Sequence, residues 1–127
     1  MTKNNLKSRL LNGETVYGPF CKLQDPSAVE IAALAGFDFV ILDMEHGPLS
    51  IESVQNISRA AKAQNLEVVV RVTENMPASI LRVLDVGVHS IQVPQVSTKE
   101  DAQEVVKSSY FHPQGERGMC RYVRAAD

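Results

Sequence analysis

The chain has few cysteines, little net charge and no long apolar run, and each of these features excludes some classes of protein. Its two cysteines, Cys21 and Cys120, stand far apart without C-x-x-C spacing, so neither a disulfide framework nor a zinc ribbon is predicted. The formal net charge is −2, with both signs scattered along 127 residues, which gives no electrostatic reason to expect nucleic acid or an anionic membrane as a partner. We therefore expect reduced thiols, and a small molecule or another protein as the partner.

Segments that would direct the chain to a membrane are also lacking. No apolar run approaches the roughly 20 residues that span a bilayer, and the opening MTKNNLKSRLLNG has no continuous apolar stretch of the signal-peptide type. Gly-rich phosphate loops and a Gly-x-Ser-x-Gly elbow do not occur either, so these two kinds of site are not predicted. The sequence predicts a cytoplasmic protein.

The composition that is present, 44% apolar and 22% charged residues, is typical of one globular domain, here residues 1–127. Four short apolar runs recur, each followed by a helix-start signal; they cover residues 16–20, 37–42, 67–72 and 90–94. The helix starts are Asp25-Pro26, Ser50, Asn75 with Pro77, and an S-x-x-E capping box of Ser97 and Glu100. Gly36 and Gly87 end the first and third helices. The pattern predicts a β-α unit repeated four times.

Strands that alternate with helices predict a parallel sheet of the α/β class, because each parallel crossover needs a helix-sized connection. Two architectures fit: an open doubly wound sheet, or part of an eight-stranded β/α barrel. A complete barrel typically needs about 250 residues, so four units would make about half of one. Residues 111–127, which are polar and rich in arginine, then read as a loop cut short after the fourth helix.

Polar side chains gather where the predicted strands end. They are Asp43, Glu45, His46, Arg71, Gln92 and Gln95. In both architectures ligands bind at the carboxyl ends of the strands, so an imidazole and a guanidinium would meet at one rim. Histidine moves protons near neutral pH, and arginine offers a fork of donors to a carboxylate or a developing oxyanion.

From composition alone, a purely structural role for these residues has about the same weight as a role in a binding or catalytic site. The segment with Asp43, Glu45 and His46 could be a solvated loop, and Arg71 could pair with Glu74. A metal cluster of the first three is less favoured, because successive strand residues point to opposite faces and a turn at residues 47–48 would be needed.

The other histidines and a group of arginines have no patterned partner. His89 and His112 are expected to be surface or packing residues. The three arginines Arg117, Arg121 and Arg124 could grip a phosphate, although a solvated loop is the commoner explanation.

Four stretches in order, AGFDFVILDMEHGP, VVVRV, ILRVLDVGVHSIQVPQV and HPQGERG, span nearly the whole chain and resemble the HpcH/HpaI aldolase family. These are class II, metal-dependent pyruvate aldolases that act on 4-hydroxy-2-oxo acids. The resemblance implies a (β/α)8 TIM barrel, of which this chain supplies about the first four βα units, and a homo-oligomer, commonly a hexamer. It implies a carbon–carbon lyase that releases pyruvate and an aldehyde. A thioester-cleaving lyase of the citrate or malyl class is a weaker alternative.

Carried over residue by residue, the resemblance places the catalytic base on His46 and the substrate-binding arginine that stabilises the enolate on Arg71. The acid that raises the basicity of the histidine falls on Asp85, with Asp43 and Glu45 as supporting neighbours. Asp85 lies near the C-terminal end of its predicted helix, at the rim opposite His46, so we expect a neighbouring subunit to deliver it.

The resemblance also implies a divalent metal, Mg²⁺, Mn²⁺ or Co²⁺. The family's metal ligands, a glutamate and an aspartate on later strands, have no counterpart in this sequence. We therefore expect the 127-residue chain to be inactive by itself. The alternative is a catalytically silent half-barrel that serves as an assembly or binding module.

Overall fold

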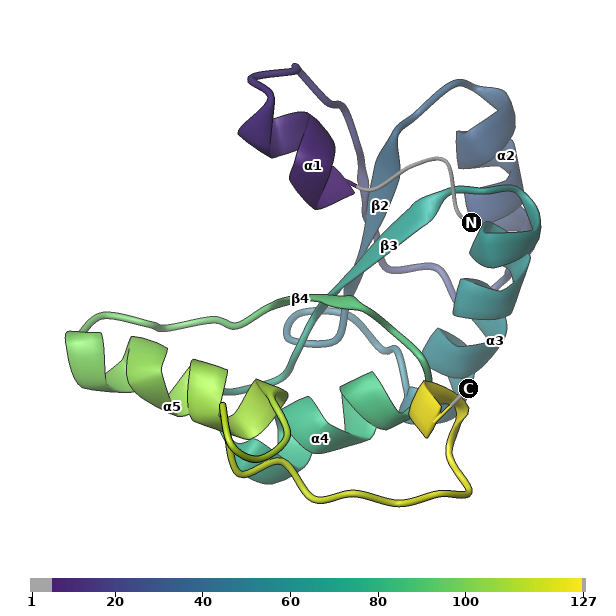
Figure 1. Ribbon diagram of the computed structural model, residues 1–127. Helices are drawn as coiled ribbons and strands as arrows, with labels where there is room; N and C mark the ends of the chain where they lie inside the picture. The colour runs from purple at the N-terminus through teal and green to yellow at the C-terminus, as the bar shows by residue number, and fades with distance from the viewer. Residues whose placement is uncertain (1–5, 127) are drawn as a thin grey trace.

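Four parallel strands form a single sheet in a computed structural model that describes residues 6–126; residues 1–5 and 127, the ends of the predicted domain, lie outside it. The strands are β1 (Phe20–Cys21), β2 (Phe39–Asp43), β3 (Glu67–Arg71) and β4 (Ser90–Gln92). The α-helices are α1 (Leu6–Leu11), α2 (Ser27–Leu34), α3 (Ile51–Ala63), α4 (Pro77–Asp85) and α5 (Lys99–Ser109), and a 3₁₀ helix, η1, covers Arg124–Ala126. After α1, strands and helices alternate (Figure 1), which confirms the four predicted βα units.

The sheet is covered by helices on one face. Val40 and Leu42 of β2 and Val70 of β3 are buried in one apolar cluster with side chains of α2, α3 and α4. Figure 1 shows these three helices along the same side of the curved sheet. The strand order β1-β2-β3-β4 follows the sequence without a reversal, whereas a doubly wound sheet reverses its order at a switch point. The arrangement is that of a β/α barrel segment.

Glycines end two helices as the sequence predicts. Gly36 after α2 and Gly87 after α4 both have a φ of +87°. This left-handed conformation is costly for residues with a Cβ and terminates helices readily. Ser50 also caps α3 as predicted, because its hydroxyl accepts a hydrogen bond of 3.1 Å from the Ser53 amide.

The capping box predicted at Ser97 and Glu100 is wrong by one residue. Thr98 is the N-cap of α5: its hydroxyl accepts from the Asp101 amide at 3.1 Å, and Asp101 accepts from the Thr98 amide at 2.8 Å. The stretch S-T-K-E-D contains both S-x-x-E and T-x-x-D, so the pattern alone could not choose between them. Asp101 also accepts from the Ser97 amide at 3.0 Å, which favours the later start.

Two other local predictions also differ from the structure. The cap of α4 is Met76, while the Asn75 side chain donates to the Asp101 carbonyl at 3.3 Å and so joins the start of α4 to α5. The first strand was expected at residues 16–20, and the structure places it at Phe20–Cys21. Pro19 accepts a backbone hydrogen bond from Ile41 but has no N–H to donate in return, so a regular ladder begins only after it.

Helix α1 was not predicted from the sequence. The guanidinium of Arg9 in this helix forms ion pairs with Asp38, which lies just before β2, at 2.6 Å and with Glu14 at 2.8 Å. Across residues 6–126, no helix is long and apolar enough to cross a membrane.

Candidate active site

A row of three polar residues crosses the sheet where the strands end. Asp43 pairs with Arg71 in the β2–β3 ladder, and Arg71 pairs with Gln92 in the β3–β4 ladder. Residues that are paired across neighbouring strands project from the same face. The sheet therefore brings these three predicted residues together at its carboxyl edge.

The guanidinium of Arg71 is bound by two carboxylates. Its Nε and Nη2 donate to Oδ1 and Oδ2 of Asp43 at 3.0 and 2.7 Å, and its Nη1 lies 3.2 Å from Oε2 of Glu45. The predicted alternative, a pair between Arg71 and Glu74, is wrong, because Glu74 instead accepts from the Ser79 hydroxyl. A planar guanidinium held at both edges keeps one orientation.

Asp43 is fully buried and fully bonded. Besides Arg71, its Oδ1 accepts from the amides of Glu45 and His46 at 3.1 and 3.0 Å, and the ammonium of Lys22 lies 3.5 Å from Oδ2. The hydrogen bonds from Arg71, followed by that from the His46 amide, hold the pKa of the Asp43 carboxyl well below its usual range, although burial opposes this. Asp43 is thus not part of a solvated loop, and its carboxylate fixes the turn after β2.

His46 follows this turn with its ring open to solvent. Its side chain is 65% exposed, and Nε2 lies 3.7 Å from Oε1 of Glu45. Gly47 is required here because a Cβ would collide with the Asp43 carbonyl oxygen. The backbone of His46 is held by Asp43, and the carboxylate of Glu45 lies next to both the imidazole and the guanidinium of Arg71.

Phe20 and Lys22, both near the end of β1, were missed in the sequence. The guanidinium carbon of Arg71 lies 5.0 Å from the centroid of the Phe20 ring, a cation–π contact, and Lys22 adds a second positive charge next to Asp43. The strand-end rule that selected Asp43 and Arg71 would have found them if it had been applied to the first strand.

Asp85, the acid predicted to raise the basicity of His46, ends α4, and its Oδ1 accepts from Nη2 of Arg117 at 2.7 Å. The Arg117 guanidinium also stacks on Phe111, with 4.6 Å to the ring centroid, and its side chain is only 8% exposed. Arg117 is therefore engaged within the chain, so the solvated loop that the sequence favoured is wrong for this arginine, and the alternative of a phosphate site is not supported for it either. Within the described chain, no hydrogen bond or ion pair joins Asp85 to His46.

The residues described here do not fit a divalent metal. In residues 6–126, no three side chains of His, Cys, Asp or Glu are grouped to hold an ion. Both oxygens of Asp43 and one of Glu45 already face Arg71, and a cation there would be repelled by that guanidinium.

Comparisons with known proteins find relatives over most of the chain. The family profile described as HpcH/HpaI aldolase/citrate lyase matches residues 17–126. The chain is 37% identical over 122 residues to a pyruvate aldolase of Rhizobium etli, covering 96% of this chain and 48% of the relative. It is also 37% identical over 116 residues to a 5-keto-4-deoxy-D-glucarate aldolase of Klebsiella pneumoniae, covering 91% and 45%.

A solved structure gives the same result. The crystal structure of an HpcH/HpaI aldolase/citrate lyase family protein from Burkholderia cenocepacia matches with a TM-score of 0.91 and 38% identity, covering 98% of this chain and 51% of that one. The chain spans about half the length of the curated relatives it matches. The predicted fold, the N-terminal part of a (β/α)8 barrel, is confirmed.

Proposed function

The chain belongs to the HpcH/HpaI aldolase/citrate lyase family, and from this premise we propose that the whole protein cleaves 4-hydroxy-2-oxo acids to pyruvate and an aldehyde. The observation that carries the proposal is the Arg71 guanidinium, which Asp43 holds at the carboxyl edge of the sheet. The exposed imidazole of His46 stands at the same edge. A fixed cation beside an exposed imidazole suits a reaction that moves one proton and builds up one negative charge.

Arg71 is proposed to bind the oxo acid and to offset the charge of the enolate. Three of its five N–H donors point to Asp43 and Glu45, which leaves two for substrate oxygens. The side chain is 19% exposed, so these donors can reach a ligand. Because Asp43 and Glu45 fix the guanidinium beforehand, little reorganisation is needed as the charge develops.

His46 is proposed to be the base. Its imidazole takes the proton of the 4-hydroxyl, the C3–C4 bond breaks, and its electron pair forms the enolate of pyruvate while C4 becomes the aldehyde carbonyl. Protonation of the enolate at C3 then gives pyruvate. Asp43 and Glu45 support this role, the first by holding the His46 amide and the second by its carboxylate 3.7 Å from Nε2.

Asp85 is proposed to act on His46 of a neighbouring subunit in a homo-oligomer, a hexamer by resemblance to the family. Asp85 ends α4, whereas His46 follows the end of β2. In a βα repeat, the end of a helix and the end of a strand lie at opposite rims of the sheet. Its Oδ1 is held by Arg117, which leaves Oδ2 to accept from a ring N–H outside this chain.

Aldolases of this family are generally metal-dependent, and a bound divalent metal would supply a Lewis acid for the carbonyl of the oxo acid. We propose that residues other than those described here hold it, whether it is Mg²⁺, Mn²⁺ or Co²⁺, because residues 6–126 do not fit a metal site.

The proposal is tested by following pyruvate release from a 4-hydroxy-2-oxo acid. The native polypeptide is first weighed by intact-mass spectrometry, which determines whether residues follow Asp127. Its turnover is then compared with that of the 127-residue chain, each with Mg²⁺ or Mn²⁺ and with EDTA. We expect turnover by the native polypeptide only if it is longer, and a longer native polypeptide that releases no pyruvate from any such acid contradicts the proposal.

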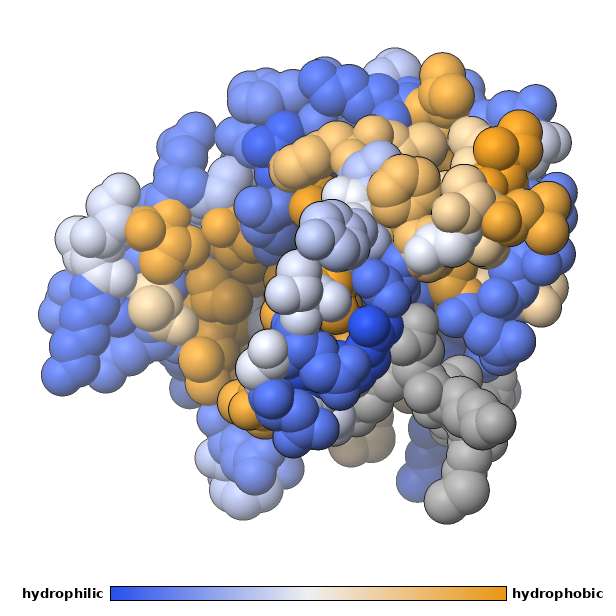
Figure 2. Space-filling model, turned by 90° about the horizontal axis from the view of Figure 1, so that it is seen from above, coloured by the Kyte–Doolittle hydropathy of each residue, from blue (hydrophilic) through white to orange (hydrophobic). Residues whose placement is uncertain are grey.

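The second candidate function is a silent half-barrel that serves as an assembly or binding module. It is favoured by the strands at the two edges, β1 and β4, each of which has a neighbour on one side only within the described sheet. Open edges need a partner. Figure 2 shows apolar residues gathered on one face of the molecule, and Phe20 of β1 is 54% exposed. A native polypeptide of 127 residues that is stable and releases no pyruvate would favour this function.

A further inference from the structure

A pocket lies at the amino ends of β3 and β4, the rim opposite Arg71. It is lined by Ser58 and Lys62 of α3, residues 65–68 at the start of β3, residues 86–89 before β4, and Arg124 of η1. Neither the proposed catalysis nor the family comparison assigns a role to this pocket.

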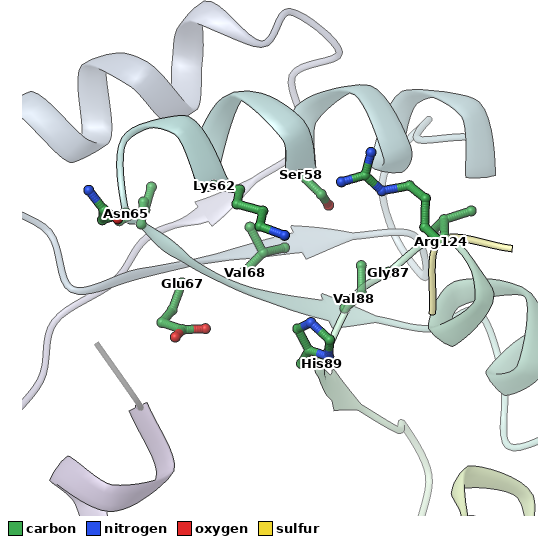
Figure 3. Close-up of a pocket in the computed structure, with 11 residues that line it drawn as sticks. Ser58, Lys62, Asn65, Glu67, Val68, Gly87, Val88, His89 and Arg124 are labelled. Atoms are coloured by element: carbon green, nitrogen blue, oxygen red, sulfur yellow. The ribbon is translucent and has the colours of Figure 1, made fainter. Parts of the chain in front are cut away.

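Two cations face the pocket without a counter-charge. Neither Lys62 nor Arg124 forms an ion pair or a side-chain hydrogen bond within residues 6–126. Figure 3 shows both side chains reaching into the space between α3 and the sheet. Lys62 is exposed and Arg124 is half-buried, so an anion that enters the pocket could contact both positive charges.

An unpartnered hydroxyl points to the same ligand. The Oγ of Ser58 is inaccessible to solvent and has no hydrogen-bond partner in the described chain. Ser58 and Lys62 are four residues apart on α3, so they lie on the same face of the helix, one turn from each other. A buried hydroxyl without a partner costs free energy that a ligand oxygen would recover.

The single carboxylate in the lining lies on the other side of β3. Glu67 and His89 are drawn in Figure 3 below the strand, away from Ser58, Lys62 and Arg124. Glu67 alternates with Val68, which faces the helices. The carboxylate of Glu67 therefore does not neutralise the two cations.

The volume of the pocket and its apolar lining restrict the ligand further. The cavity holds about 200 Å³, less than the roughly 300 Å³ at which pockets for drug-sized ligands begin. Leu66, Val68, Val86 and Val88 supply an apolar floor. Gly87 allows Arg124 to pack against the backbone at this position. A Cβ at residue 87 would lie 3.1 Å from the Arg124 Cβ, which is a crowded contact.

We propose that this pocket binds a small oxyanion, a carboxylate or phosphate group on a short body, through Arg124, Lys62 and the Ser58 hydroxyl. The site is separate from the carboxyl-edge row of Asp43 and Arg71, and it does not depend on aldolase activity.

The test titrates the ¹⁵N-labelled 127-residue chain with butyrate and, separately, with inorganic phosphate, while amide shifts are followed by NMR. We expect saturable shifts at the amides of Ser58, Leu66 and Gly87 with at least one probe. Butyrate binding alone would assign a carboxylate ligand, and phosphate binding alone a phosphate group. Arg124→Gln should weaken binding about tenfold or more, as expected for loss of a charge-assisted hydrogen bond. Lys62→Ala provides a second variant in case the first disturbs η1.

The matched control is Arg82→Gln, which removes an exposed arginine from α4 outside the pocket. It should leave the affinity unchanged. The proposal is overturned if neither probe gives saturable shifts at the pocket amides. It is equally overturned if Arg82→Gln weakens binding as much as Arg124→Gln, since the attraction would then be a general effect of surface charge.

Discussion

Arg71 donates hydrogen bonds to both carboxylate oxygens of Asp43, a residue 28 positions earlier in the chain and its direct neighbour in the sheet ladder. The same carboxylate accepts the amides of Glu45 and His46. One buried acid thus orients the guanidinium and fixes the backbone of the imidazole. The position of the proposed catalytic pair depends on Asp43, whose own side chain is fully buried.

Replacing Asp43 should therefore destabilise the fold as well as the site. Asp43→Asn keeps the size of the side chain but loses the charge and one acceptor, and we expect a loss of about 1.5–3 kcal/mol in the free energy of unfolding, measured with urea. The control is Glu45→Gln, which disturbs the 3.2 Å contact to Arg71 and the 3.7 Å contact to His46 of a partly exposed residue. An equal loss in the two variants would contradict the central position of Asp43.

Acid should remove the contribution of Asp43. The pKa of this carboxyl is lowered in the folded state, chiefly by its hydrogen bonds from Arg71, relative to about 3.9 in the unfolded chain. A group with a lowered folded pKa contributes stability above its unfolded pKa, and this stability is lost as the pH falls towards the folded pKa. The difference in unfolding free energy between wild type and Asp43→Asn should be constant near neutral pH and shrink below about pH 4. A difference that stays constant in acid would show that the charge of Asp43 does not stabilise the fold.

His46→Ala should abolish most of the activity without harming the fold. The side chain is 65% exposed, so its loss leaves no cavity, whereas loss of a general base costs about 10²-fold or more in turnover. Pyruvate release by the active native protein measures the first effect, and circular dichroism the second. His112→Gln, at an exposed histidine outside the site, serves as the control. Unchanged turnover in His46→Ala would remove this residue from the mechanism.

Mixed oligomers can show whether Asp85 acts across subunits. His46→Ala and Asp85→Ala should each be nearly inactive as pure oligomers, because every composite site would lack one partner. Co-refolded mixtures should regain activity, since some sites would combine an intact His46 with an intact Asp85 from the neighbour. Mixed oligomers that are verified by mass spectrometry and stay inactive would contradict the shared site. Arg117→Gln, which frees Asp85 from its 2.7 Å bond, tests separately whether that contact orients the acid.

The start of α5 gives a paired test of helix capping. Thr98→Ala removes the hydroxyl that accepts from the Asp101 amide and should cost about 1 kcal/mol of stability. Ser97→Ala, one residue earlier, should change it by less than about 0.5 kcal/mol, because only the backbone amide of Ser97 is bonded to Asp101. Thermal unfolding of the two variants measures the difference. A larger effect at Ser97 would restore the capping box that the sequence pattern first suggested.

The sequence by itself determined the four βα units, the helix ends at Gly36 and Gly87, and the placement of Asp43, His46 and Arg71 at the carboxyl ends of their strands. These features are local. Apolar periodicity, a glycine that accepts positive φ and the order of residues along a strand are all contained within a few positions of the chain.

Tertiary structure alone decided which groups meet. The sequence offered Glu74, three positions away, as a partner for Arg71, and the sheet register supplied Asp43 instead. The pocket of Lys62 and Arg124 joins α3 to a segment some sixty residues later, and no short pattern announces it. Register and packing between distant segments depend on the burial of the whole apolar face at once, and a local pattern does not contain that information.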